Sequence, residues 1–111
     1  MILTLKQEKA IIRTLLRKLG TSEEEADATA EVLAEGDLRG LGSHGILRLP
    51  YILRGLKRGT IIARAKVKVR VVKRTPAAAL IDGGHGLGHH VAIRAMKLAI
   101  RKAKKQGIGA V

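Results

Sequence analysis

Apolar side chains recur at helical spacing in the first part of the chain. They form one stripe, made of Leu5, Ile12, Leu15, Leu16 and Leu19. This spacing predicts a helix over residues 5–19. Thr4 and Gln7 have the spacing of a capping box at its start, and Gly20 is placed to end it in the left-handed conformation.

A second predicted helix runs from about residue 22 to residue 38. Ser22 and Glu25 repeat the capping-box spacing, and three consecutive glutamates place negative charge at the positive end of the helix dipole. The expected inner face consists of Ala26, Ala30 and Leu33. Such small side chains favour close packing against a neighbouring helix.

The helical pattern is interrupted over residues 39–48, which begin with three glycines in seven positions. Ser43 is a candidate cap for a further helix over about residues 45–57. Pro50 fits only near the start of such a helix, because an interior proline removes a backbone donor. A short turn followed by a helix from Pro50 is therefore the preferred prediction.

Past Gly59 the apolar pattern changes from helical to alternating. Valines alternate with basic residues over 66–71, which predicts a strand with one buried face. The valines are Val67, Val69 and Val71. Pro76 interrupts the pattern, and a second strand is expected over residues 78–81, ending at Asp82.

A long helix is expected over about residues 87–106, with Gly107 at its end. Its predicted inner face carries Val91, Ala92, Ala95, Met96, Leu98 and Ala99. Residues 108–111 are again apolar and have the pattern of a further strand. Because natural domains seldom end on an apolar strand directly after a helix, we expect the sequence to continue beyond Val111.

Together these elements predict an α/β fold. We expect a single segment over residues 1–111, helical over 1–58, with a strand pair and a helix over 65–106. Its length of 111 residues suffices for one domain. The core must be aliphatic, because the chain has no Phe, no Trp and one tyrosine, and the absence of cysteine excludes disulfides and thiolate metal sites.

The net charge of +13 has two interpretations. One is a small module that binds nucleic acid or an anionic membrane. The other, which we favour, is a basic surface whose acidic counterpart lies elsewhere, because the cations are spread over 6–18, 54–74 and 94–105. Abundant Lys and Arg on helices also suits a thermophile. No membrane span or secretory signal is visible, so we expect a cytoplasmic protein.

A candidate site for chemistry lies at Ser43, His44 and Arg48. Imidazole titrates near neutral pH and suits proton exchange with a hydroxyl or carbonyl oxygen. If the following residues are helical, Arg48 lies one turn beyond His44, where its guanidinium would bind a substrate carboxylate. On spacing alone, a histidine and an arginine at a helix start with no functional role are the simpler interpretation.

The turn over residues 83–88 is rich in glycine and lies between a strand and a helix, as a phosphate-binding loop would. His89 occupies the third glycine position of the dinucleotide-binding spacing, so an ordinary tight turn is preferred. His85 and His89 are four residues apart, but His85 precedes the helix. No cysteine or well-placed carboxylate beyond Asp82 completes the set, so we expect no metal.

Five blocks of the sequence occur in a recognisable order. They are S-E-E-E-A-D (22–27), D-L-R-G-L-G-S-H-G-I-L-R-L-P (37–50), A-L-I-D-G-G-H-G-L-G (79–88), A-M-K-L-A-I-R-K-A-K (95–104) and G-I-G-A-V (107–111). Together they resemble the amino-terminal region of the type 2 malate/L-lactate dehydrogenase family, which includes malate, sulfolactate and ureidoglycolate dehydrogenases. The S-H-G block in its D-L-R-G context is its most specific element.

The resemblance implies a non-Rossmann enzyme that transfers hydride between NAD or NADP and a small 2-oxo or 2-hydroxy acid such as malate or lactate. It implies that His44 is the acid/base and that Arg48 binds the substrate carboxylate. Ser43 is expected to hydrogen-bond in the same pocket or to orient His44. A homodimer is implied as well. The family's cofactor-binding residues lie mostly beyond Val111, so none is assigned here and the chain alone is expected to be inactive.

The sequence also departs from the family pattern. His89 stands where many members have glutamine, and His85, His90 and the basic strand over 66–74 are unusual. These departures bear on the choice of substrate and cofactor. Two other functions stay open: a small basic nucleic-acid-binding module, and a truncated, non-catalytic relative that serves in oligomerisation.

Overall fold

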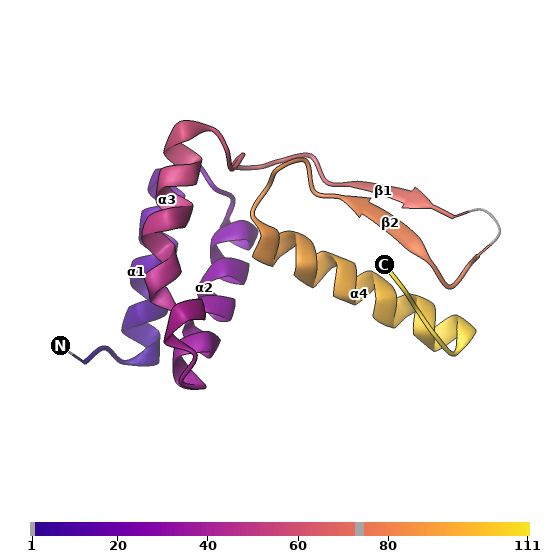
Figure 1. Ribbon diagram of the computed structural model, residues 1–111, viewed down its shortest axis with the longest axis horizontal. Coiled ribbons are helices and arrows are strands. Elements are labelled where there is room, and N and C mark those ends of the chain that lie inside the picture. The colour runs from indigo at the N-terminus through magenta and orange to yellow at the C-terminus, as the bar shows by residue number, and fades with distance from the viewer. Residues whose placement is uncertain (1, 73–74) are drawn as a thin grey trace.

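The computed structural model describes residues 2–72 and 75–111. It contains a bundle of three helices, from which a fourth helix and a two-stranded ribbon extend (Figure 1). The elements are α1 (Leu5–Lys18), α2 (Glu23–Leu38), the 3-10 turns η1 (Gly42–His44) and η2 (Ile46–Arg48), α3 (Leu49–Arg58), β1 (Lys68–Val71), β2 (Ala79–Asp82) and α4 (Gly88–Gln106). The predicted α/β class is confirmed.

Both predicted capping boxes are present. The Gln7 backbone N–H donates to Thr4 Oγ1 at 3.2 Å, and the Thr4 N–H donates to Gln7 Oε1 at 2.9 Å. Ser22 and Glu25 make the same reciprocal pair at 3.1 and 2.8 Å. Each box satisfies two amides that lack a partner within the helix, which fixes where α1 and α2 begin.

The core lies where α1, α2 and α3 meet, and the start of α4 closes it. Alanines on the buried face of α2 let α1 approach closely, as predicted. The core residues are Ile12, Leu16, Ala26, Ala30, Leu33, Leu49, Ile52 and Leu87. The predicted stripe on α1 is too wide at its start, because Leu5 is 39% exposed in the first helical turn, beyond the reach of α2.

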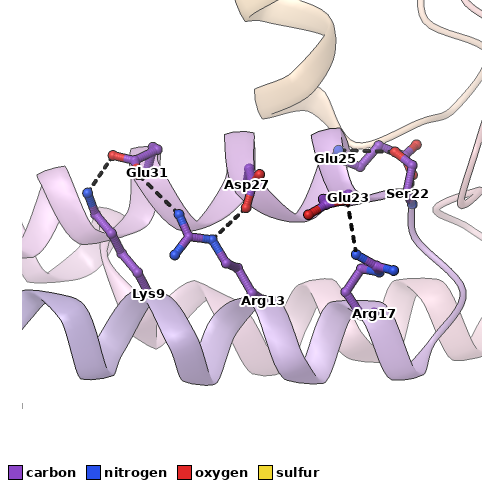
Figure 2. A network of polar contacts seen from close by, with 8 residues as sticks. All are labelled: Lys9, Arg13, Arg17, Ser22, Glu23, Glu25, Asp27 and Glu31. Atoms are coloured by element: carbon purple, nitrogen blue, oxygen red, sulfur yellow. Dashed lines mark hydrogen bonds and ion pairs between the residues drawn. The ribbon is translucent and has the colours of Figure 1, made fainter.

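A row of ion pairs also joins α1 to α2 (Figure 2). The pairs are Lys9–Glu31 at 2.5 Å, Arg13–Asp27 at 2.5 Å, Arg13–Glu31 at 3.3 Å and Arg17–Glu23 at 3.9 Å. Most of these side chains are well exposed, so each pair contributes at most about 1 kcal/mol. Their larger effect is on charge, because they engage basic residues of α1 with acidic residues of α2.

The connection from α3 to β1 is tied back to α2 through Glu25. Both carboxylate oxygens of Glu25 accept from the Arg64 backbone N–H, at 2.9 and 3.0 Å. One of them, Oε2, also accepts from the Ser22 backbone N–H in the capping box. Arg64 has a positive φ of 56°, an uncommon conformation for a non-glycine residue. Glu25 is buried, so this contact anchors the connection to the bundle.

Strands β1 and β2 pair antiparallel, with Lys68 opposite Asp82 and Val71 opposite Ala79. The predicted buried face of β1 is wrong, because every residue of this strand is exposed and Val71 is 71% exposed. No other described element covers β1, whereas Ala79 of the neighbouring β2 is buried. The last two positions of the predicted basic strand, 73 and 74, lie outside the described residues.

Helix α4 ends at Gln106 and is followed by Gly107, as predicted, and Gly107 has a left-handed φ of 84°. Its inner face is narrower than expected, because Ala92 and Met96 are exposed, Met96 at 62%. The residues after Gly107 fold back along α4. Ala110 forms a parallel bridge with Ala78, so the predicted last strand is a single bridge rather than a continuous strand.

The molecule is elongated, with principal extents of 52 × 30 × 21 Å. Its radius of gyration is 15.6 Å, compared with about 13 Å for a compact domain of this length. The extra length comes from α4 and the ribbon, which project from the helical bundle (Figure 1). None of the described helices has both the length and the apolar character needed to cross a membrane.

Candidate functional site

The segment that carries Ser43, His44 and Arg48 lies against the carboxyl end of α2, and two glycines permit this contact. A Cβ at Gly36 would lie 2.8 Å from the backbone oxygen of His44. A Cβ at Gly45 would collide with the carboxylate of Asp37. Close packing therefore requires glycine on both sides of the contact, at Gly36 in α2 and at Gly45 in the segment.

Asp37 holds the segment in place. Its Oδ2 accepts a hydrogen bond from the Ile46 backbone N–H at 2.6 Å. Upstream, the Leu41 N–H donates to the Gly36 carbonyl at 2.8 Å, and the His44 N–H donates to the Leu41 carbonyl at 2.7 Å. The segment is thus fixed at both ends of η1 and at the start of η2, although it contains only these two short 3-10 turns and no α-helix.

A second carboxyl, Glu8 of α1, lies buried beside Asp37. Burial raises the pKa of Glu8, and the hydrogen bond and negative charge of Asp37 raise it further. Its Oε1 has no hydrogen-bond partner among the described residues. A protonated Glu8 can donate to Asp37, so the two carboxyls can share a proton beneath the segment that carries His44.

His44 lies at the end of η1 and is exposed to solvent. Its Nδ1 lies 2.9 Å from Ser43 Oγ, a hydrogen bond in which either atom can be the donor. This contact orients the ring and engages Nδ1, so that Nε2 is the nitrogen left for a ligand. The structure thus brings Ser43 and His44 together.

Arg48 is not one helical turn beyond His44, contrary to the expectation. Gly45, with φ −95° and ψ −147°, separates η1 from η2, so the predicted helix over 45–57 is wrong. The preferred prediction, a short turn followed by a helix from Pro50, is confirmed, because α3 begins at Leu49 with Pro50 in its first turn.

Arg48 instead lines a cleft of about 330 Å³ between α3 and the start of α4. The other lining residues are Tyr51, Ile52, Ile61, Leu87, Gly88 and His89. The ion pairs of the described residues lie on α1 and α2 and at the end of α2, and none includes Arg48. Its guanidinium is therefore available to an anion, whereas His44 lies outside the residues that line this cleft.

His89 is the site residue that sequence reasoning missed. The sequence relates His89 to His85 and marks it as a departure from the family pattern, but it does not place His89 beside Arg48. His85 lies in the turn before α4 with φ 59°. In the structure His89 lines the same cleft as Arg48, and burial lowers the pKa of His89. Within residues 2–72 and 75–111, no three His, Cys, Asp or Glu side chains are grouped as a metal site would need.

The glycine-rich turn before α4 is filled by the protein itself. A Cβ at Gly84 would lie 2.9 Å from the Lys66 carbonyl oxygen, and one at Gly86 would lie 2.9 Å from the Ala65 side chain. Asp82 Oδ1 accepts from the Gly84 N–H at 2.9 Å, which closes the turn. These glycines face protein atoms, which supports the tight-turn interpretation over a phosphate cradle.

Comparison with known proteins decides the family. The family model described as Malate/L-lactate dehydrogenase matches residues 3–111. The chain belongs to this family. The L-sulfolactate dehydrogenase of Methanocaldococcus jannaschii is 47% identical over 111 residues, and the malate/(S)-sulfolactate dehydrogenase of Methanothermus fervidus is 45% identical over the same length. Both matches cover 100% of this chain and 32% of the relative.

Solved structures of the malate/L-lactate dehydrogenase family share this fold. The malate dehydrogenase of Pyrococcus horikoshii OT3 superimposes with a TM-score of 0.93 at 41% identity, covering 99% of this chain and 32% of that one. The sulfolactate dehydrogenase of Methanocaldococcus jannaschii gives 0.84 at 47% identity, covering 94% and 30%. The chain thus spans about a third of the length of these relatives and matches their amino-terminal part.

Proposed function

We propose that this chain is part of a dehydrogenase that interconverts a 2-hydroxy acid of the malate or sulfolactate kind and its 2-oxo acid, with NAD or NADP. The observation that carries the proposal is the unpaired Arg48 at the cleft, close in sequence to a histidine oriented by Ser43. A guanidinium matches a carboxylate through two parallel hydrogen bonds. The proposal includes a cytoplasmic homodimer, which rests on the family resemblance.

In this proposal His44 is the acid/base. In the oxidative direction, the proton of the substrate hydroxyl passes to His44 Nε2 as the bond from C2 to hydrogen breaks. In the reductive direction, His44 returns that proton to the carbonyl oxygen. Nε2 can take this proton only in the tautomer that carries the ring's own proton on Nδ1, so Ser43 Oγ accepts a hydrogen bond from Nδ1–H in both directions and holds that tautomer.

The nicotinamide cofactor supplies the acceptor and donor of hydride. The glycine-rich turn before α4 does not fit its diphosphate, because Gly84 packs on Lys66 and Gly86 packs on Ala65. The contribution of this chain is therefore to bind the substrate and to hold and move the proton. Since the chain spans about a third of the length of its relatives, we expect no turnover from the 111 residues alone.

The proposal is tested with the complete gene product that contains these residues. Oxaloacetate or pyruvate, with NADH or NADPH, should give turnover that is followed at the nicotinamide absorbance. Arg48→Ala should raise KM by at least about tenfold, because a charge-assisted hydrogen-bonded pair contributes roughly 1.5–3 kcal/mol to binding. No turnover with any 2-oxo acid, or an unchanged KM in a folded Arg48→Ala variant, would overturn it.

A further inference from the structure

The Arg48 cleft has a second polar wall that the proposed function leaves without a role. Arg48 comes from the end of η2, and His89 comes from the first turn of α4. Between them, Ile52, Ile61 and Leu87 supply apolar lining. Two hydrogen-bonding side chains therefore face one cleft from elements that are far apart in sequence.

The His89 side chain is half-buried, and one of its ring nitrogens lacks the hydrogen bond that a buried polar atom normally makes. Its Nδ1 is inaccessible to solvent and has no hydrogen-bond partner among the described residues. A buried polar atom without a partner is uncommon in folded proteins and calls for an explanation. Here the unpartnered ring nitrogen belongs to a residue that lines the cleft.

The surroundings of Nδ1 also determine which nitrogen of the His89 ring carries the proton. Burial lowers the pKa of His89, so the ring is neutral at pH 7 and carries one N–H. A buried N–H without an acceptor is costly, which favours the tautomer with the proton on Nε2. His89 then offers a neutral Nε2–H donor opposite the cationic Arg48.

We propose that His89 determines specificity in this cleft by donating a hydrogen bond to the second acidic group of the substrate, a carboxylate or a sulfonate. The inference rests on the proposed function, in which Arg48 binds the first acidic group. A neutral donor adds a hydrogen bond for a second acidic group beside the cationic Arg48, and hydrogen bonds to an ionised acceptor are the stronger kind. An acid without that group leaves the donor unsatisfied, and sites of this kind discriminate strongly against such analogues.

The test measures, by calorimetry, the binding of L-malate and of L-lactate to the complete gene product that contains these residues. Ionic strength is held constant, because a net charge of +13 attracts any dianion. Wild type should prefer malate over lactate by about tenfold, as expected for one additional hydrogen bond to a charged group. His89→Leu should bind malate about tenfold more weakly and leave the lactate affinity within about twofold. His89→Gln, which keeps an N–H donor, should retain part of the preference.

Two further variants separate the possible failures. His90→Leu is the matched control, because His90 lies in the groove between α2 and α4 and does not line the Arg48 cleft. It should leave both affinities unchanged. Arg48→Ala should weaken both acids. If it weakens neither, or if wild type binds neither acid, the proposed function is overturned and the inference with it. If Arg48 is required but folded His89→Leu keeps the malate preference, only the role of His89 is overturned.

Discussion

The Asp37 carboxylate accepts a 2.6 Å hydrogen bond from the backbone N–H of Ile46. This one contact joins the end of α2 to the turn between His44 and Arg48. It holds the chain directly after Gly45, whose extended ψ of −147° separates η1 from η2. The position of both candidate site residues therefore depends on Asp37.

Removal of this contact should destabilise the segment. Asp37→Ala leaves the Ile46 N–H without its acceptor, which should lower the free energy of unfolding by about 1–3 kcal/mol. Asp37→Asn keeps an oxygen that can accept the same bond and should lose less. Urea unfolding followed by circular dichroism measures both variants. Equal stability of Asp37→Ala and wild type would show that the contact does not hold the segment.

The two glycines of the turn should differ sharply in their tolerance of alanine. A Cβ at Gly45 collides with Asp37, whereas a Cβ at Gly42 meets nothing within 4 Å. Gly45→Ala should therefore cost about 1–3 kcal/mol through overpacking, and Gly42→Ala less than about 0.5 kcal/mol. Thermal unfolding of the pair compares one substitution at two nearby positions. Similar melting temperatures for the two variants would contradict the packing described here.

Glu8 should make stability depend on pH. Burial and the neighbouring Asp37 raise its pKa above the ordinary value of 4.5, so the folded state binds more protons than the unfolded state between the two pKa values. Its stabilising contribution is present below pH 4.5 and is lost as the pH rises through the raised pKa. Wild type should thus lose stability relative to Glu8→Gln as the pH rises from 4.5 through the raised pKa.

The matched control for this titration is Glu24→Gln, since Glu24 is an exposed glutamate in the first turn of α2. It should not show the same divergence from wild type. A difference between Glu8→Gln and wild type that stays constant across this pH range would mean that Glu8 does not change its protonation there.

The sequence predicts the parts of this fold that depend on local interactions. The capping boxes at Thr4 and Ser22 and the left-handed stop at Gly20 are set by neighbouring residues, and all three are confirmed. The exposure of β1 was not predictable in this way. An alternating pattern states which side chains share a face, but only the packing of other layers decides whether that face is covered.

In the candidate site, too, the local contacts could be predicted from the sequence and the long-range contacts could not. Ser43 and His44 are adjacent in sequence, and their pairing in the structure follows from that. The cleft of Arg48 and His89 joins residues 41 positions apart, and no periodic pattern relates them. The departure of His89 from the family pattern was a signal for substrate choice, but it did not indicate that Arg48 lines the same cleft.

The central claim is that His44 transfers the proton in a 2-hydroxyacid dehydrogenase. The most direct test is the kcat for oxaloacetate, with NADH or NADPH, of the gene product that contains residues 1–111, in wild type and in His44→Ala. Loss of a general acid/base should lower kcat by about 100-fold or more, while His90→Ala should be unaffected. A folded His44→Ala enzyme with wild-type kcat would contradict the assignment.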